Sequence, residues 1–256
     1  MRITSWNVNS AKARQEHILD YLRAGSTDVL LIQETKTQDV NFPTDLYADI
    51  GWNVAFHGQK SYNGVAIASR FDIDEVACGL PGDNDDEQAR YMEATINGVR
   101  VATIYLPNGN PAPGPKFDYK LAWMDRLRAR ASYLMASEVP VILGGDFNVI
   151  PHDIDCYDPA GWEGDALTRD ETRAAFFRIC HDGYVDAIRA AYPQDVIYSY
   201  WDYQAGAWQK DNGVRIDHLL LSPEAADKMT SAGVDKGPRG LEKPSDHTPV
   251  WVELKD

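Results

Sequence analysis

The sequence has few cysteines, no long apolar runs and few basic residues, and each shortage excludes a class of protein. The three cysteines, Cys78, Cys156 and Cys180, are an odd number without the spacing of a metal site, so we expect reduced thiols and a cytoplasmic protein. No apolar run is long enough to span a membrane, and the strand-like first residues leave no room for a secretory signal. No linker rich in serine, glycine or proline interrupts the 256 residues, which predicts a single domain over residues 1–256.

The formal net charge is −14, from 39 acidic and 25 basic residues. This argues against a nucleic-acid partner, because proteins that bind phosphates usually present a basic face. Net charge does not tell where the charges lie, and several acids gather at 83–87 in an expected solvent-exposed loop. A nucleic-acid partner would require the basic residues to gather on one face of the protein. The candidates are Lys36, Lys60, Lys116, Lys120 and Arg215.

The stretch at 139–151 is the most informative part of the chain, because an apolar run in it ends in polar residues. The run predicts a strand that is buried on both faces, and the two glycines after it predict a sharp turn. Asp146 and Asn148 are two residues apart, so an extended chain would send both side chains to the same side. A turn in which Asp146 closes a core strand would explain this pair equally well.

Strands and helices alternate along the rest of the chain. We expect further strands at 2–7, 28–34, 52–56, 64–69, 91–96, 99–106, 198–201, 214–221 and 248–254, and helices at 12–23, 117–137 and 170–181. The polar residues at 152–169 predict a surface loop. Many strands are joined as hairpins and few by a crossing helix, which favours a layered α/β fold with mixed sheets over a purely parallel one.

Polar residues recur where predicted strands end or begin. They are Asn7, Glu34, the pair Asp146 and Asn148, and the run from Ser245 through Asp246 to His247. Asp217 is a further candidate, because it interrupts an apolar strand and a buried carboxylate is costly without a partner. His247 would suit it, since a carboxylate favours the charged imidazolium, which can stabilise a phosphate. A structural contact between Asp217 and Arg215 is the alternative.

Carboxylates and amides without cysteine form a set of hard oxygen ligands, which suits Mg²⁺ or Mn²⁺ better than zinc. Such ions bind substrate phosphates and orient the attacking water. The residues at the strand ends therefore predict hydrolysis of a phosphodiester, with Mg²⁺ as the cofactor and Mn²⁺ as a possible substitute.

Seven short motifs lie in order along residues 5–250. They are SWNVN at 5–9, LIQETK at 31–36, NGVA at 63–66, YLPNG at 105–109, GGDFN at 144–148, RID at 215–217 and SDHTPV at 245–250. In this order they resemble the exonuclease III family of abasic-site (AP) endonucleases, within the endonuclease/exonuclease/phosphatase superfamily. The QETK and YLPNG stretches are similar to the AP endonuclease branch rather than to lipid phosphatases or DNase I-like enzymes.

The resemblance implies a two-layered sandwich of mixed β-sheets flanked by helices, which has four layers in the order α/β/β/α and a site at one edge of the sheets. It implies a Mg²⁺-dependent DNA repair nuclease that cuts 5′ to abasic sites and leaves a 3′-hydroxyl, with 3′→5′ exonuclease and 3′-phosphatase activity. The expected partner is double-stranded DNA with abasic sites or blocked 3′ ends. We expect a monomer that does not bind a membrane.

The resemblance also assigns roles in chemistry to single residues. The candidate metal ligands are Glu34 first, then Asn7, Asp146, Asn148, Asp246 and His247. Asp146 would orient or deprotonate the attacking water, and Asn148 would position the water and the phosphate. His247, paired with Asp217, would stabilise charge on the phosphoryl oxygens. Tyr105 and Asn108 would contact the same phosphate.

A second set of residues would bind the substrate. The resemblance implies that the regions of Tyr200 and Trp201, and of Val214, Arg215 and Ile216, line a pocket for a flipped-out sugar without a base. An apolar wall there would favour a missing base over a normal one, because flipping a normal base also costs stacking energy. Lys60 lies in a basic loop that would face the substrate, unless this loop is a plain hairpin connection.

Three other functions are compatible with the sequence. In a relative dominated by exonuclease activity, the pocket beside Val214 would be open enough to admit a base. A phosphatase or phosphodiesterase of the same superfamily, acting on a lipid or another non-DNA substrate, would fit the acidic charge. A binding protein that has lost catalysis would have to explain why all six of these residues are present: Asn7, Glu34, Asp146, Asn148, Asp217 and His247.

Overall fold

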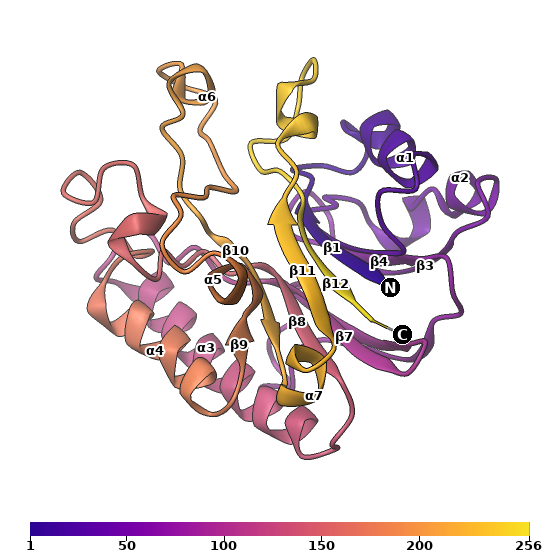
Figure 1. Cartoon of the computed structure of the whole chain (residues 1–256), viewed down its shortest axis with the longest axis horizontal. Coiled ribbons are helices and arrows are strands. Elements are labelled where there is room, and N and C mark those ends of the chain that lie inside the picture. The colour runs from indigo at the N-terminus through magenta and orange to yellow at the C-terminus, as the bar shows by residue number, and fades with distance from the viewer. Residues whose placement is uncertain (256) are drawn as a thin grey trace.

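The computed structural model describes residues 1–255 and shows two six-stranded β-sheets that pack face to face (Figure 1). The strands of the first sheet, in spatial order, are β11 (Met229–Val234), β12 (Val250–Leu254), β1 (Arg2–Asn7), β2 (Val29–Gln33), β4 (Val65–Ser69) and β3 (Asn53–His57). Those of the second sheet are β5 (Asp74–Cys78), β6 (Tyr91–Ile96), β7 (Val99–Tyr105), β8 (Val141–Asp146), β10 (Asp217–Leu221) and β9 (Val185–Asp186). Each sheet contains a parallel pair, β1 with β2 and β7 with β8, among antiparallel neighbours, so both sheets are mixed as predicted.

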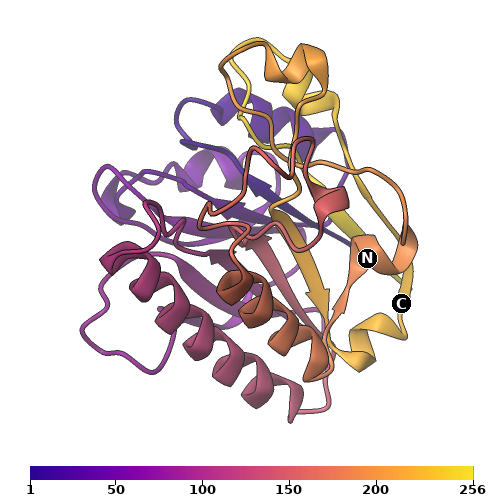
Figure 2. The same cartoon turned by 90° about the vertical axis from the view of Figure 1, so that its left-hand side faces the viewer.

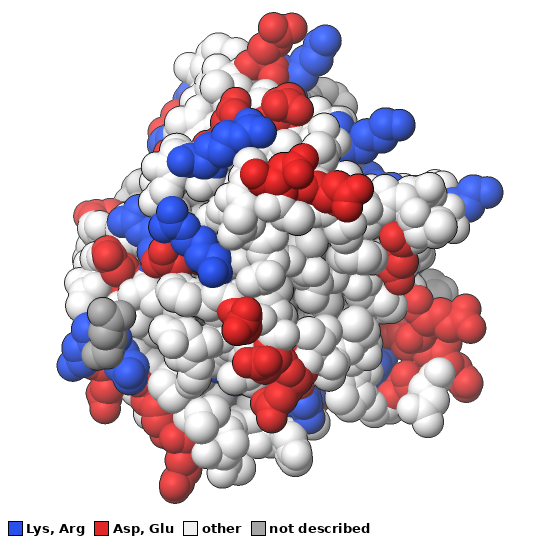
Figure 3. All heavy atoms as spheres, turned by 90° about the vertical axis from the view of Figure 1, so that its right-hand side faces the viewer, with Lys and Arg blue, Asp and Glu red and all other residues white. Residues whose placement is uncertain are grey.

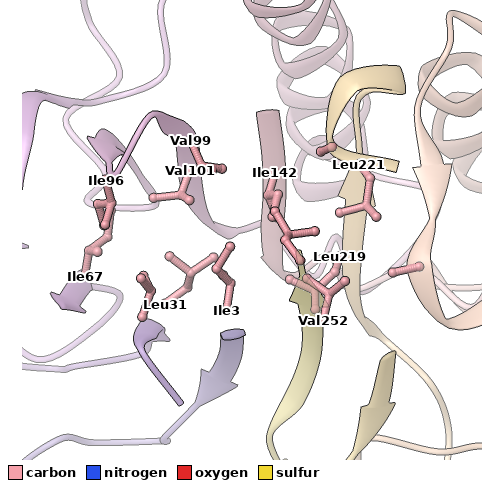
Figure 4. Packing of buried hydrophobic residues seen from close by; sticks show 14 of the residues in the cluster. Ile3, Leu31, Ile67, Ile96, Val99, Val101, Ile142, Leu219, Leu221 and Val252 are labelled. Atoms are coloured by element: carbon pink, nitrogen blue, oxygen red, sulfur yellow. The ribbon is translucent and has the colours of Figure 1, made fainter. Parts of the chain in front are cut away.

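The space between the sheets is filled by apolar side chains from both of them (Figure 4). Ile3 and Leu31 come from the first sheet and Ile142 and Leu219 from the second, and all four are fully buried. The side chains of β2 that point away from this core, such as Leu30, are also apolar, because they pack against the helices on the other side of the sheet. Coverage of both faces explains why the apolar runs of this chain are unbroken rather than alternating.

Helices cover the outer faces of both sheets, which gives four layers in the order α/β/β/α (Figure 1 and Figure 2). α1 (Gln15–Arg23) and α2 (Thr44–Ala48) pack on the first sheet, and α3 (Pro115–Met135) and α4 (Asp170–His181) lie side by side on the second. The predicted α/β sandwich is confirmed. The short helices α5 (Ala187–Ala191), α6 (Ala207–Lys210) and α7 (Pro223–Ala226), and 3₁₀ turns at 39–41, 153–155 and 237–240, lie in the connections. Within residues 1–255, no helix has the length and apolar character needed to cross a membrane.

One predicted strand is absent, and another begins later than predicted. Residues 198–201 do not form a strand, because Tyr200 makes only isolated bridges to Val214 and to His247. The strand predicted at 214–221 begins at Asp217. The sequence pattern misses β5 and β11, which lie at sheet edges and are exposed along all or part of their length, so they show no apolar alternation.

The two glycines of the central stretch do not turn the chain, contrary to the prediction, because both lie inside β8. A Cβ on Gly144 would lie 2.7 Å from side-chain atoms of Leu219 and of Leu31, which belong to the neighbouring strand and to the opposite sheet. A Cβ on Gly145 would lie 1.9 Å from the carbonyl oxygen of Ile104. Glycine is required at these positions because other chain segments approach the backbone closely.

The strand ends bring the predicted polar residues to one edge of the sandwich. β1 and β2 run in parallel, so Asn7 at the end of β1 and Glu34 directly after β2 leave the first sheet at the same edge. In the second sheet Tyr105 at the end of β7 lies opposite Asp146 at the end of β8, and Asp217 at the start of the antiparallel β10 also lies opposite Asp146. Side chains from both sheets therefore meet at this edge.

Candidate active site

A cavity of about 270 Å³ opens where these strand ends meet. Its lining consists of Glu34, Tyr105, Asn108, Asn110, Asp146, Asn148, Trp162, Asp165, Leu167, Tyr200, Ile216, Asp246 and His247. Asn7 and Asp217 are fully buried and lie directly behind this lining, to which they are hydrogen-bonded. The structure therefore brings together all the residues that the sequence assigned to catalysis and metal binding.

Asn7 fixes the two carboxylates on either side of it. Its Nδ2 donates to Glu34 Oε1 and to Asp146 Oδ2, each at 2.9 Å. Glu34 has a φ of 53°, in the left-handed region that residues with a Cβ rarely adopt, and such strained positions cluster at functional sites. Burial alone would raise the pKa of Glu34, but hydrogen bonds from Lys36 and Asn7 lower it. Glu34 is therefore a charged carboxylate at neutral pH, 2.8 Å from the Lys36 ammonium.

Glu34, Asp146 and His247 form a group that could hold a metal ion, since one ligand atom of each lies within 4.8 Å of the other two. Two carboxylates at this spacing suit a hard divalent ion such as Mg²⁺. Asp246 and Asn148 line the same cavity, and each has a side-chain oxygen that accepts a hydrogen bond from a neighbouring asparagine. The side chains present thus fit an ion held by oxygen ligands around Glu34.

The carboxylate of Asp146 lies in surroundings that oppose its charge. Burial raises its pKa to about 7, the charges of Asp217 and Glu34 act in the same direction, and His247 and Asn7 oppose the shift. A carboxylate with a pKa near the working pH can accept a proton from a bound water and release it again. These properties suit a general base.

His247 is held as a charged imidazolium. Its Nδ1 donates to Asp217 Oδ2 at 2.8 Å, and Ser199 Oγ donates to the same oxygen at 2.6 Å, so the predicted pairing of His247 with Asp217 is confirmed. Burial alone would lower the pKa of His247, but the carboxylates of Asp217 and Asp146 raise it to about 10. An imidazolium carries a proton on both ring nitrogens, so in this state His247 can donate a second hydrogen bond through Nε2.

Asn148 and Asn108 line the same cavity as Glu34 and are hydrogen-bonded to each other. The backbone N–H of Asn148 donates to Asp146 Oδ1 at 2.9 Å, so the aspartate also makes the turn that the sequence offered as the alternative. Asn108 Nδ2 donates to Asn148 Oδ1 at 3.1 Å, and Asn148 Nδ2 donates to the carbonyl of Leu106 at 2.9 Å. Burial raises the pKa of the adjacent Tyr105, with help from the charges of Glu34 and Asp146, so its hydroxyl remains a donor.

Two of the predicted substrate-binding residues are wrong. Arg215 is fully buried and its guanidinium is paired with Asp155 and Asp186, so it has no access to a substrate. Trp201 is also fully buried, packs edge-on against Trp208 and donates its Nε1–H to Asp211. Neither side chain lines the cavity.

Tyr200 and Val214 lie where the pocket was expected, but they face different spaces. Tyr200 lines the cavity and stacks edge-on against His247, with ring centroids 4.9 Å apart. Val214 is almost fully buried and borders a second hollow of about 270 Å³ that adjoins the first at Tyr200 and Trp162. The sequence offered no role for Trp162, Asp165 and Leu167, because their segment was predicted to be a plain surface loop. The available signal was the presence of large apolar and aromatic residues, Ile154, Tyr157, Trp162 and Leu167, in a segment that is rich in acids.

The predicted basic face is only partly present. Lys36 and Lys60, together with Lys12, line a groove of about 710 Å³ that reaches the cavity at Lys36, and no acid is among its described lining residues. Lys120 and Arg215 are fully buried and do not contribute to any surface, so the prediction is wrong for these two. On the face that Figure 3 shows, acidic and basic residues are interspersed rather than separated. The net charge of −14 therefore coexists with a local basic groove beside the cavity.

Known proteins are similar to this chain in both sequence and fold. Residues 4–247 match the profile of the endonuclease/exonuclease/phosphatase family. The exodeoxyribonuclease of Bacillus subtilis is 33% identical over 98% of both chains, and exodeoxyribonuclease III of Haemophilus influenzae is 30% identical over 100% of both. The solved structure of the 3′ phosphatase NExo from Neisseria, bound to a product DNA hairpin, has a TM-score of 0.98 at 38% identity, and that of an AP endonuclease from Archaeoglobus fulgidus has 0.96 at 33%; each match covers 100% of both chains. The chain belongs to the endonuclease/exonuclease/phosphatase family.

Proposed function

We propose that the protein is a Mg²⁺-dependent DNA nuclease that cuts the backbone 5′ to abasic sites and also processes 3′ ends. The observation that carries the proposal is the pairing of a raised-pKa Asp146 with a charged His247 beside Glu34 in one cavity. The relatives support the choice of substrate, since they are named exodeoxyribonuclease III, DNA repair nuclease APEX1 and AP endonuclease. The groove lined by Lys12, Lys36 and Lys60 offers the charge that a DNA backbone requires.

The metal ion would be held by Glu34 and Asp146, whose positions Asn7 fixes. When bound, it would polarise a phosphoryl oxygen and neutralise negative charge. Mn²⁺ has similar ligand preferences and would substitute. His247 would act beside the ion rather than on it, because a charged imidazolium has no free lone pair for a metal. Asp246 and Asn148, each with one side-chain oxygen hydrogen-bonded to an asparagine, would complete the surroundings of the ion.

In the proposed reaction Asp146 takes a proton from the attacking water, and Asn148 holds that water and the phosphate in line. The His247 imidazolium donates through Nε2 to an oxygen on which charge builds, while Asp217 holds the ring in place through Nδ1. Tyr105 and Asn108 donate to the same phosphate. Donors aimed at developing charge in this way are each worth about 10²–10³ in rate.

The apolar part of the cavity supports the preference for a missing base. Trp162, Leu167, Tyr200 and Ile216 would surround a deoxyribose and offer little hydrogen bonding to a base. A nucleotide without a base is also easier to flip out of the helix, because it loses no pairing and little stacking.

Dominant activity at 3′ ends is the second candidate, and one observation favours it. The two NExo structures from Neisseria, named as a 3′ phosphatase and as a 3′-5′ exonuclease, match with a TM-score of 0.98 and 38–39% identity, above the 33% of the AP endonuclease structure.

We further propose that the protein acts as a monomer in the cytoplasm, where its cysteines, all free within residues 1–255, would stay reduced.

A comparison of three substrates tests these activities against each other. One duplex carries a single tetrahydrofuran abasic-site analogue, a second a 3′-phosphate at a nick, and a third an unmodified recessed 3′ end. We expect incision 5′ to the analogue at the highest kcat/KM with Mg²⁺. Faster removal of the 3′-phosphate or of 3′ nucleotides, with slow incision, would shift the assignment to the second candidate. No turnover of any of the three would refute both.

A further inference from the structure

Lys120 is an unusual residue for the interior of a protein, and it takes no direct part in the proposed chemistry. It lies on α3 and is fully buried. Its Nζ donates three hydrogen bonds, to the backbone carbonyls of Asn108 at 3.0 Å, Asn148 at 2.6 Å and Ala166 at 3.2 Å. Burial lowers the pKa of Lys120 to about 7, whereas the three carbonyls around Nζ favour the charged ammonium because each accepts one of its protons. A buried side chain of this kind needs a reason that an apolar one would not satisfy.

The three carbonyls belong to three loops that are distant in sequence and meet at the cavity. Asn108 follows β7, Asn148 follows β8, and Ala166 precedes α4. Each loop places a side chain in the cavity lining, either the same residue or, beside Ala166, the neighbouring Asp165 and Leu167. An ammonium has three protons arranged to reach three acceptors, so one lysine can join all three loops at one point.

The packing around the lysine stem shows that the chain is built to admit it. Gly109 has a φ of 91°, and a Cβ there would lie 2.6 Å from Lys120 Cδ and 3.3 Å from the Cβ of Ala166. A residue with a side chain at position 109 would therefore push against the stem that carries the ammonium. Glycine at this position permits the left-handed backbone and also leaves space for the side chain of Lys120.

We propose that Lys120 is a positioning residue, whose ammonium binds the carbonyls of Asn108, Asn148 and Ala166 and thereby sets the positions of the Asn108 and Asn148 side chains against the phosphate. The proposal rests on the proposed function of these two asparagines. Their direct hydrogen bond of 3.1 Å fixes their distance from each other, and the hydrogen bonds from Lys120 to their backbone carbonyls tie both to helix α3. Lys120 touches no substrate and acts through the loops that it joins.

The test replaces Lys120 by methionine, which keeps the length of the side chain and removes all three donors. We expect kcat for incision to fall by about 100-fold, because a small misplacement of the reacting groups has an effect of this size, while KM changes by less than about threefold, since the lysines of the groove are untouched. Lys120→Arg retains donors and should recover part of kcat. Arg128→Met removes a surface cation from the same helix, where it pairs with Asp182, and should leave kcat unchanged.

Unchanged kcat in Lys120→Met would overturn the proposal, and so would a fall in which Lys120→Arg recovers nothing. If Lys120→Met does not fold, as judged by circular dichroism, Lys120→Gln decides, because its amide has only two protons for the three carbonyls. A loss of kcat with KM preserved in Lys120→Gln then supports the proposal, and full activity overturns it. Each variant is compared with the unaltered protein, so absence of DNA cleavage by the latter would refute the proposed function and is distinguishable from failure of the role of Lys120.

Discussion

In the native enzyme, activity should not depend on the titration of His247 between pH 6 and pH 9. Replacement of Asp217 by asparagine should make the enzyme lose activity as the pH rises through this range. Asparagine has the shape of aspartate, and its Oδ1 can replace Oδ2 as the acceptor for His247 Nδ1 and Ser199 Oγ. The change therefore removes a buried negative charge while it keeps the orientation of the ring. Because that charge is a principal cause of the raised pKa of His247, the variant isolates the electrostatic contribution of the pair.

The size of the effect follows from the protonation of the ring. In the native enzyme the pKa of His247 is raised to about 10, so the ring stays charged throughout the neutral range and its contribution is lost only above that value. At the ordinary pKa of about 6.5 the ring would be only about 3% protonated at pH 8 but mostly protonated at pH 6. The variant should therefore lose about 30-fold in rate relative to the native enzyme at pH 8, and less than about twofold at pH 6.

The assay is single-turnover incision of a duplex with one abasic-site analogue, at saturating enzyme, from pH 6 to pH 9. Ser199→Ala is the matched control, because it removes the other donor to Asp217 Oδ2 and keeps the charge. Its rate relative to the native enzyme should not vary with pH. A constant ratio of Asp217→Asn to native rates across this range would refute the conclusion that Asp217 keeps His247 charged.

Two further predictions concern residues outside the reacting centre. Within residues 1–255, Arg215→Met removes the only ion pair of Asp186 with an arginine and leaves the buried Asp155 paired with Arg189 alone. The free energy of unfolding should therefore fall by about 3–5 kcal/mol in a urea titration, with KM of the folded enzyme unchanged. A raised KM with native stability would instead make Arg215 a substrate contact. Lys60→Ala removes a positive charge from the basic groove, so DNA affinity should fall about equally for all sequences and the slope of log K against log salt should decrease by about 1; an unchanged slope would show that DNA does not lie along this groove.

The chemistry-bearing residues could be predicted from the sequence because they stand at the ends of strands that are buried on both faces. An apolar run that ends in Glu34 or in Asp146 predicts both the presence of a buried strand and the residue at which the strand ends. Parallel pairing of such strands then places their ends at one edge. The first step needs only local sequence, whereas the second joins segments that are distant in the chain.

The substrate pocket could not be predicted in the same way, because neighbours in sequence point in opposite directions in an extended chain. Tyr200 lines the cavity and Trp201 faces Trp208, and Ile216 lines it while Arg215 turns toward Asp155 and Asp186. A motif names both members of each pair and does not say which one faces the substrate.

The segment at 152–169 was beyond prediction for a different reason. Its place against the cavity depends on distant contacts, above all the ion pair of Asp155 with Arg215 and the hydrogen bond from Lys120 to the carbonyl of Ala166. No local pattern encodes such contacts, so a polar segment with several acids predicts only an exposed loop.

Metal-dependent hydrolysis at Glu34 is tested most directly by incision of the abasic-site duplex by the native enzyme and by Glu34→Ala, each with Mg²⁺ and with EDTA. We expect cleavage immediately 5′ to the lesion by the native enzyme with Mg²⁺, no cleavage with EDTA, and a large loss of rate in the variant at a nearly unchanged melting temperature. Equal turnover by the native enzyme and the variant, or turnover in EDTA, would contradict the claim that Glu34 and its neighbours form a metal-dependent hydrolytic centre.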